Sequence, residues 1–315
     1  MENRKIEINL GLVCNNFCKF CMNKAPLKER KFPDFEFLKK ELGDYYQKGY
    51  RAVGFLGGEP TIYPRLIELV SFTKGLGYQE IQIISNGRRY SDKNFLERLI
   101  TAGVTRFYVS IHSYKEEVED KLISVRGGFR QKIQGLLNLR NFQKNGMIKD
   151  KIFLNTVINK LNYKHLKGIV LFFNNMGFSD VRFNFIRPEG NALANAKSLV
   201  PRYSEVMKYV VEAVKLKEKL PVNLSFEAIP FCSFCEYGIE DFKDYVGEFK
   251  DADVVASFGE KNKRDRFNVA ERRKNQLRIK KASCRSCDFD SVCEGPWKNY
   301  VKIYGFKEFK PVKLK

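Results

Sequence analysis

The sequence lacks any hydrophobic run that approaches the roughly 18 residues a membrane-spanning helix requires. It also lacks an apolar signal core after Met1, because the first residues lead at once into a strand-like pattern. These absences predict a protein without a membrane segment, and the cytoplasm as its default location. No low-complexity tract and no solenoid-type repeat is present, which excludes a repeat architecture.

Acidic residues are too few to balance the basic ones. The chain has 57 Lys and Arg against 37 Asp and Glu, a net charge of +20. Such an excess is compatible with nucleic acid or an acidic peptide as a partner, although dispersed lysines often only solvate a surface. The densest basic segment, Lys261–Lys281, has ten basic and two acidic residues. It could dock a leader peptide or a phosphate backbone, or form a solvated helix or loop.

Short apolar runs alternate with helix-period segments from residue 5 to residue 188, which predicts βα units around a parallel sheet. Six strands are expected, near Ile6–Leu10, Ala52–Leu56, Ile81–Ser85, Phe107–His112, Ile152–Val157 and Val181–Ile186. Helices are expected at Phe35–Lys48, Arg65–Leu76, Asn94–Ala102, Phe129–Asn141 and Lys164–Asn175. The fold class is therefore α/β.

The composition changes after residue 190. Small residues through Ala192–Lys197 predict a linker, and a helix at Tyr203–Lys217 follows it. Leu224 and Phe226 then indicate an alternating strand. We place a domain boundary near 195–200, so that 1–195 form a core domain and 196–315 an extension.

Three cysteines, Cys14, Cys18 and Cys21, lie within eight residues directly after the first expected strand. In a reducing compartment such spacings indicate metal ligation in place of disulfides. Thiolates are the ligands of iron–sulfur clusters, and a cubane of four irons normally takes four of them. Three ligands leave one iron open to a small molecule, as in catalytic metal sites. A zinc loop or an unligated thiol loop is the alternative.

The spacing Cys-x3-Cys-x2-Cys, with Phe20 before the last cysteine, resembles the signature of the radical S-adenosylmethionine (radical SAM) superfamily. The resemblance implies that Cys14, Cys18 and Cys21 are catalytic and hold a [4Fe-4S] cluster whose open iron binds S-adenosylmethionine (SAM). It also implies a 5′-deoxyadenosyl radical, and a low-potential electron donor such as ferredoxin or flavodoxin. The expected fold is a partial (β/α)6 TIM-like barrel with a small C-terminal α+β cluster-binding extension.

Polar residues gather at the carboxyl ends of the expected strands, where βα barrels place their chemistry. Gly57-Gly58-Glu59-Pro60 alone would be a weak turn signal, but one βα unit after the cysteines it resembles the family's GGE motif. The resemblance assigns Gly58 and Glu59 to the methionyl ammonium of SAM. It further implies cofactor contacts for Phe20 in the cysteine loop, and for Ser110, Asn155 and Arg187 on or just after the later strands. Each of the last three is also typical of an ordinary local or surface role.

His112 is one of two histidines in the chain. With a pKa near neutrality it could exchange protons with a substrate. A hydrogen-bonded histidine at a strand end is the interpretation we favour.

The C-terminal cysteines Cys284, Cys287 and Cys293, followed by Glu-Gly-Pro-Trp, resemble part of the auxiliary-cluster extension called SPASM, or its shorter relative twitch. A full SPASM extension has seven cysteines, whereas this one has five, including Cys232 and Cys235. We expect one auxiliary [4Fe-4S] cluster on Cys284, Cys287, Cys293 and one of Cys232 or Cys235. A zinc staple is the alternative.

These features together predict a radical SAM oxidoreductase or maturase that oxidises or cross-links an organic substrate. A ribosomal peptide is the leading substrate class, by analogy at the level of the fold. Modification of a tRNA or a small molecule stays open. A non-catalytic iron–sulfur or zinc protein that binds nucleic acid is the alternative from a different class.

Overall fold

The computed structural model describes residues 4–22, 31–238, 253–258 and 264–313. Its centre is one nine-stranded sheet with the order β7-β6-β5-β4-β3-β2-β1-β8-β9. The six core strands are β1 (Lys5–Asn9), β2 (Ala52–Leu56), β3 (Glu80–Ser85), β4 (Arg106–Ser110), β5 (Ile152–Ile158) and β6 (Asp180–Phe185). They pair in parallel, in chain order. The α/β class and the six core strands are thus confirmed.

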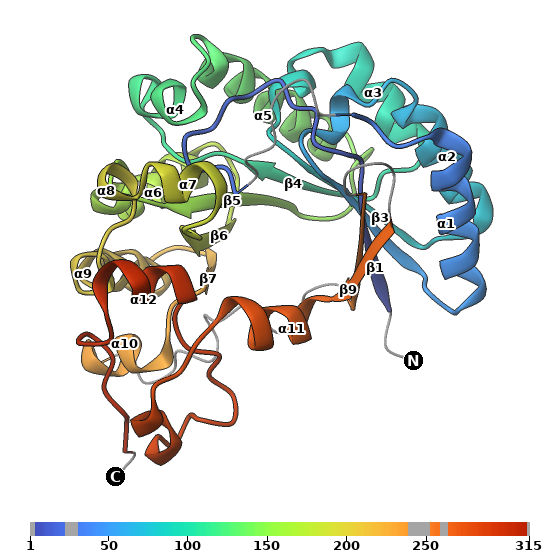
Figure 1. Cartoon of the computed structure of the whole chain (residues 1–315). Coiled ribbons are helices and arrows are strands. Elements are labelled where there is room, and N and C mark those ends of the chain that lie inside the picture. The colour runs from blue at the N-terminus through green and yellow to red at the C-terminus, as the bar shows by residue number, and fades with distance from the viewer. Residues whose placement is uncertain (1–3, 23–30, 239–252, 259–263, 314–315) are drawn as a thin grey trace.

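Helices connect these strands and cover the outer face of the sheet (Figure 1). They are α1 (Phe35–Gln47), α2 (Leu66–Leu76), α3 (Lys93–Ala102), α4 (Glu116–Ile123), α5 (Gly128–Lys144) and α6 (Leu166–Asn175). Asp34 and Asp92 cap α1 and α3, and Gly77 ends α2 in the left-handed conformation. Five of the six helices were expected, and α4 was not.

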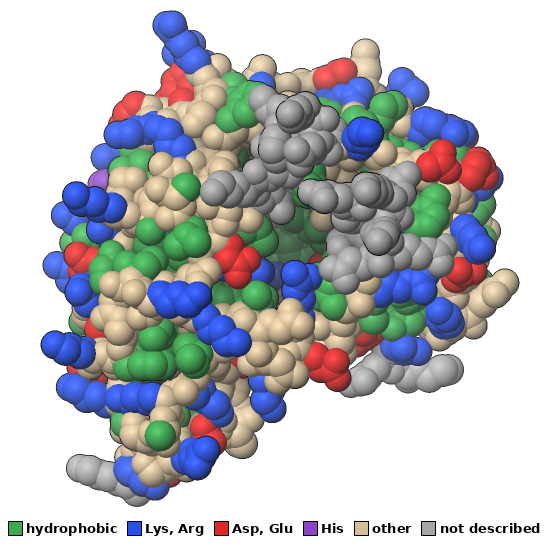
Figure 2. All heavy atoms as spheres, in the orientation of Figure 1, with side chains coloured by type: hydrophobic (Ala, Val, Ile, Leu, Met, Phe, Trp, Pro, Cys, Tyr) green, Lys and Arg blue, Asp and Glu red, His purple; other side chains and the backbone are tan. Residues whose placement is uncertain are grey.

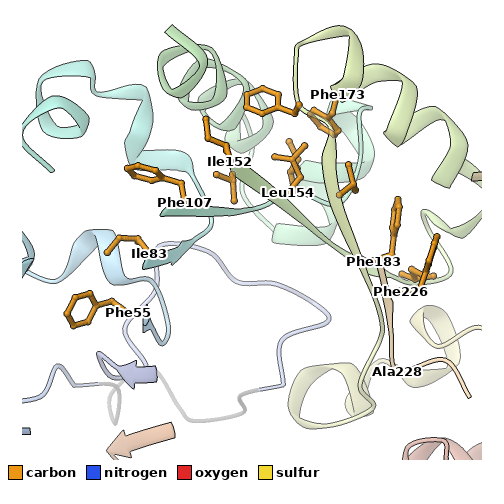
Figure 3. Close-up of a cluster of buried hydrophobic side chains, with 14 of the residues drawn as sticks. Phe55, Ile83, Phe107, Ile152, Leu154, Phe173, Phe183, Phe226 and Ala228 are labelled. Atoms are coloured by element: carbon orange, nitrogen blue, oxygen red, sulfur yellow. The ribbon is translucent and has the colours of Figure 1, made fainter. Parts of the chain in front are cut away.

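Buried apolar side chains from successive strands form the core beneath the helices. Figure 3 labels such a side chain on each of the strands β2 to β6, and all five are fully buried: Phe55, Ile83, Phe107, Leu154 and Phe183. Along a strand such as β5, buried residues on the outer face alternate with partly buried residues on the other face. Asn155 is one of these partly buried residues. The polar alternation leaves the inner face of the sheet available for a site.

The sheet has more strands than the six expected. β7 (Asn223–Glu227) adds to β6 in parallel, β8 (Val254–Phe258) adds to β1 in parallel, and β9 (Arg264–Asn268) pairs antiparallel with β8. The alternating pattern at Leu224 and Phe226 correctly indicated β7, whereas β8 and β9 were not expected. All three strands continue the core sheet. The boundary at 195–200 stays a prediction.

The segment expected to be a linker is helical, so that prediction was wrong. Its small residues form α7 (Gly190–Ala194) and α8 (Ala196–Leu199). Alanine and leucine favour a helix, and both helices are short enough to escape a periodicity analysis. The remaining helices are α9 (Tyr203–Val214), α10 (Phe231–Glu236), α11 (Val269–Arg272) and α12 (Lys298–Tyr304). α10 and α12 lie beyond β7 (Figure 1).

No helix among the described residues is long and apolar enough to cross a membrane. Lys and Arg side chains are scattered over the face drawn in Figure 2 and do not form one block there. Of the basic segment Lys261–Lys281, residues 261–263 lie outside the described residues. The rest forms β9, α11, a π-helical turn (Arg273–Leu277) and a few residues that lead to the C-terminal cysteines.

Candidate active site

The loop after β1 carries the three N-terminal cysteines and is held from two sides. The amides of Phe17 and Lys19 donate to the carbonyls of Ile123 and Leu122 at the end of α4, both at 2.9 Å. On the other side, the amide of Asn191 in α7 donates to the carbonyl of Cys21 at 2.9 Å. The loop is therefore fixed by backbone bonds to helices distant in sequence.

The thiols of Cys14, Cys18 and Cys21 are partly buried, and none of the eight cysteines forms a disulfide. Burial raises the pKa of the Cys18 thiol to about 12. Lys132 opposes this rise, whereas Cys14 and Cys21 add to it, so the three thiols lie close enough to interact. Without a metal such a thiol stays protonated at neutral pH, and metal binding would release its proton.

The Gly57-Gly58-Glu59-Pro60 motif lies against the cysteine loop. The amides of Gly58 and Glu59 donate to the carbonyls of Gly11 and Val13 at 2.7 and 2.8 Å. A Cβ on Gly58 would lie 2.2 Å from the carbonyl oxygen of Val13, so only glycine permits this approach. The structure thus brings the two motifs together, as the sequence predicted.

The Glu59 carboxylate is buried and heavily hydrogen-bonded. Its Oε1 accepts from the Thr61 amide at 3.0 Å and from the hydroxyls of Thr61 and Ser85 at 2.6 Å. Its Oε2 accepts from the Asn86 amide at 2.7 Å. The side chain therefore links the end of β2 to the end of β3, in addition to any contact with a cofactor.

A second link to β3 runs through asparagines that the sequence analysis did not single out. Asn86 Nδ2 donates to Asn15 Oδ1 at 2.6 Å. Arg88 donates to Asn16 Oδ1 at 2.9 Å and also to the carbonyl of Asn15. Asn15 and Asn16 stand between the first two cysteines, and this position was the one available signal of their role.

Ser110 and Asn155 end up side by side. They are register partners on β4 and β5, at the carboxyl end of the sheet where the cysteine loop lies. The Asn155 side chain accepts a hydrogen bond from Asn184 of β6. This places a row of polar side chains on the partly buried inner face of the sheet. Their contact with a cofactor stays a prediction.

Arg187 follows β6 and contacts the extension. It forms an ion pair with Glu189 at 2.5 Å, and its guanidinium lies 5.4 Å from the Trp297 ring centre. Its Nε is buried and has no hydrogen-bond partner in the structure. The predicted role of Arg187 near the adenine stays a prediction.

His112 is buried and structural. Its Nδ1 accepts from the Val157 amide at 3.1 Å, and its ring meets the Phe20 ring edge-on at 4.5 Å between centres. Burial lowers the pKa of His112 to about 4, so it is neutral at physiological pH. This geometry agrees with the interpretation of His112 as a hydrogen-bonded residue at a strand end. Phe20 of the cysteine loop packs against the His112 ring.

Four of the five C-terminal cysteines line one small, mostly apolar cavity between α10 and the last loop. These are Cys232, Cys284, Cys287 and Cys293, together with Phe231 and Phe289 among others. Burial raises the pKa of the Cys232 thiol to about 12, and the other three thiols raise it further. Cys235, on the same helix, does not line this cavity. The geometry thus distinguishes Cys232 from Cys235, which spacing alone did not.

The donor sets fit iron–sulfur clusters in number and chemistry. The first offers three thiols and the second four. In the described part of the chain, no three His, Cys, Asp or Glu side chains are gathered closely enough to hold a single metal ion. The agreement with iron–sulfur clusters therefore depends on the kind and number of the donor side chains. Metal analysis of the protein would identify the bound metal.

The comparisons with known proteins agree with this site. The family model of the Radical SAM superfamily matches residues 8–173. A probable GTP 3′,8-cyclase of Saccharolobus islandicus (strain M.14.25 / Kamchatka #1) is 27% identical over 185 residues, 59% of this chain and 58% of that protein. An AdoMet-dependent heme synthase of Oleidesulfovibrio alaskensis is 25% identical over 201 residues, 62% of this chain and 49% of that protein. The match thus spans about half of these relatives.

Similarity to a solved structure extends over nearly the whole chain. Streptococcus suis SuiB bound to S-adenosylmethionine has a TM-score of 0.65 at 17% identity, covering 98% of this chain and 76% of SuiB. SuiB bound to its precursor peptide SuiA has a TM-score of 0.63. At such low identity the likeness concerns the fold, and it includes the extension.

A family match to residues 8–173 covers more than half of the 315-residue chain and contains the cysteine loop, the GGE motif and Ser110. The extra C-terminal cysteines are consistent with an auxiliary cluster of the SPASM type. The chain therefore belongs to the radical SAM superfamily and is an enzyme of that family, which uses S-adenosylmethionine and a [4Fe-4S] cluster.

Proposed function

We propose that this enzyme is a two-cluster radical SAM oxidoreductase or maturase, with Cys14, Cys18 and Cys21 holding the SAM-binding cluster. Gly58, Glu59, Ser110 and Asn155 would bind SAM at the adjoining strand ends. The auxiliary cluster would be held by Cys232, Cys284, Cys287 and Cys293. When bound, the first cluster supplies the electron that cleaves SAM, and the second would accept an electron from the substrate.

One observation carries the two-cluster proposal: four thiols from two distant segments line the same apolar cavity. Apolar walls keep water away from a cluster and so influence its potential. In the first site the protein's own contribution is positional. Glu59 and the Asn15–Asn86 contact hold the cysteine loop against the ends of β2 and β3, so the three thiols keep one arrangement.

Cys232 and Cys235 provide a matched test of this proposal, because both lie on α10. The full chain, reconstituted without oxygen, should hold about eight irons and no zinc. Cys232→Ser should lower this to about four irons, and Cys235→Ser should leave about eight. Equal iron in the two variants, or one zinc per chain in the wild type, would contradict the auxiliary assignment.

The SAM-cleaving site has a separate readout. With SAM and a strong reductant, the wild-type enzyme and Cys232→Ser should both release 5′-deoxyadenosine, whereas Cys18→Ala should not. Release by Cys18→Ala would contradict the assignment of the N-terminal cysteines. The loss of 5′-deoxyadenosine in both variants would contradict the separation of the two roles.

We propose a peptide as the substrate class. The likeness of the whole chain to SuiB, which has been solved with a precursor peptide, supports this choice, and the net charge of +20 suits an acidic peptide. The test is whether a short peptide is encoded beside this gene and whether mass spectrometry detects a change in it after incubation with enzyme, SAM and reductant. Loss of two hydrogen atoms supports the proposal, and an unchanged peptide opposes it.

A nucleotide is the second candidate, because relatives named probable GTP 3′,8-cyclase are 27% identical over 59% of the chain. GTP in place of the peptide in the same assay distinguishes the two. Consumption of GTP together with 5′-deoxyadenosine release, and no change in the peptide, would favour this candidate. A low-potential donor such as ferredoxin or flavodoxin would replace the chemical reductant in the cell.

A further inference from the structure

A buried ion pair lies between α4 and α5, and nothing in the proposed function uses it. Lys132 Nζ is 2.6 Å from Glu119 Oε1, and both side chains are 0% exposed. Burial raises the pKa of Glu119, but Lys132 and His112 lower it by more, so the carboxylate is charged. Buried ion pairs seldom stabilise a fold more than apolar residues would, so a role beyond stability is worth seeking.

The other hydrogen bonds of this pair lead to the end of β4, beside the cysteine loop. Lys132 Nζ donates to the Ser110 carbonyl at 2.8 Å, and Glu119 Oε2 accepts from the His112 amide at 2.7 Å. Glu119 lies on α4, whose last carbonyls hold the amides of Phe17 and Lys19. The pair therefore lies directly behind the loop that carries Cys18.

The charges of the pair act on Cys18 with unequal strength. Among the charged groups that influence this thiol, Lys132 has the largest effect and Glu119 a smaller one than Cys14 or Cys21. The ammonium therefore has a larger effect on this thiol than the carboxylate paired with it. Because the Lys132 side chain is 0% exposed, it can act through its charge but cannot touch a ligand on the open face.

We propose that the Lys132–Glu119 pair sets the reduction potential of the cluster held by Cys14, Cys18 and Cys21. A cluster gains negative charge on reduction, so a nearby buried ammonium favours its reduced state and Glu119 moderates the effect. The two side chains are positioning residues, since they also fix Ser110 and His112. This inference depends on the proposed assignment of the N-terminal cluster.

Two single variants of the reconstituted full chain test the proposal by the sign of their effects. Potentials are measured by titration followed by electron paramagnetic resonance, using the signal that changes when SAM is added. Lys132→Met should lower the potential, and Glu119→Gln should raise it. We expect each to change the reduced-to-oxidised ratio at a fixed potential about tenfold, which equals 59 mV for one electron.

A double variant, Lys132→Met with Glu119→Leu, keeps the test valid if a single variant fails to fold, because it leaves no unpaired buried charge. Its potential should lie below that of the wild type, since the dominant charge is lost. The matched control is the Arg130–Glu116 pair on the same two helices, 2.8 Å apart with side chains 78% and 38% exposed. Arg130→Gln and Glu116→Gln should leave the potential unchanged.

Unchanged potentials in the Lys132 and Glu119 variants, or shifts of the same sign in both single variants, would overturn the proposal. A purely structural role would alter folding and leave the potential where it was. Failure of the underlying cluster assignment is recognised separately, because Cys18→Ala would then keep the SAM-sensitive signal.

Discussion

Glu59 concentrates more hydrogen bonds than any other residue described in the site. It accepts from Thr61, Ser85 and Asn86 while its own amide donates to the cysteine loop. Replacing such a carboxylate by another group would leave buried hydrogen-bond donors without an acceptor. Glu59 therefore has a structural role that does not depend on the proposed contact with SAM.

Glu59→Gln should therefore destabilise the apo chain by about 2–3 kcal/mol, because an NH2 group would face donors that now meet a charged oxygen. Urea unfolding of the apo chain measures this. The control is Glu68→Gln, an exposed carboxylate on α2 paired with Arg65, which should have a much smaller effect. Equal midpoints for the two variants would contradict the role assigned to Glu59.

His112 should make the stability of the apo chain depend on pH. Its pKa is about 4 in the folded chain and about 6.5 when unfolded, so the unfolded state binds the proton first as pH falls. This contribution is fully present above pH 6.5 and decreases toward pH 4, by about 2 kcal/mol between pH 7.5 and pH 5.

The measurement is urea unfolding of the apo chain at pH 7.5 and pH 5, compared with His112→Gln. The variant should lose about 2 kcal/mol less than the wild type between these values. His165→Gln should differ much less from the wild type, because His165 is largely outside the core. The same pH dependence in His112→Gln and in the wild type would show that His112 is not the titrating group.

Short elements position the cysteine loop. Asn191 of α7 and Asn195 just after it donate through their side chains to the carbonyls of Cys18 and Lys19, both at 3.3 Å, and the Asn191 amide bonds the Cys21 carbonyl. The paired variant Asn191→Ala/Asn195→Ala should fold but lose iron from the first cluster faster during exposure to a chelator. The measurement is iron retained per chain over time, with Ser198→Ala on α8 as the control. Identical time courses would mean that α7 does not support the loop.

Element-scale prediction from sequence succeeded for the apolar core strands and for helices of ten residues or more. β2 (Ala52–Leu56) has the expected bounds, because four of its five residues are buried on a sheet covered on its outer face. It failed for α4 and α7, which are too short for a clear helical period, and for β8, whose partner β1 is some 250 residues away. Strand pairing at that separation depends on tertiary contacts that local pattern does not contain.

The candidate site was predictable to the same extent. Cysteine spacing and the GGE motif located the loop and its neighbour, since both are local in sequence. Spacing could not choose Cys232 over Cys235, because the choice depends on how α10 packs. Lys132 and Glu119 look like ordinary helix-surface charges in the sequence, and only the packing of α4 on α5 reveals that they are buried.

At the scale of the whole molecule, Trp297 joins the C-terminal segment 273–304 to the end of β6. Its Nε1 donates to the Phe185 carbonyl at the end of β6 at 3.4 Å, and the Arg278 guanidinium lies 3.5 Å from its ring centre. Asn299, two residues further on, donates through its side chain to the Pro188 carbonyl at 2.9 Å. Trp297 and Asn299 thus attach the C-terminal segment to the end of β6 and the loop after it.

Trp297→Ala should therefore loosen residues 273–304 while the core sheet stays intact. Removing a buried tryptophan costs about 3–5 kcal/mol, and the loss falls on the contacts of 273–304 with β6, not on β2 to β5. Amide hydrogen exchange measures this: protection should fall in 273–304 and stay unchanged in β3 and β4. Trp297→Phe keeps a ring for Arg278 and should preserve most of the protection. A uniform loss across β3 and β4 would mean that the extension and the core unfold as one unit, and that Trp297 is not the joint between them.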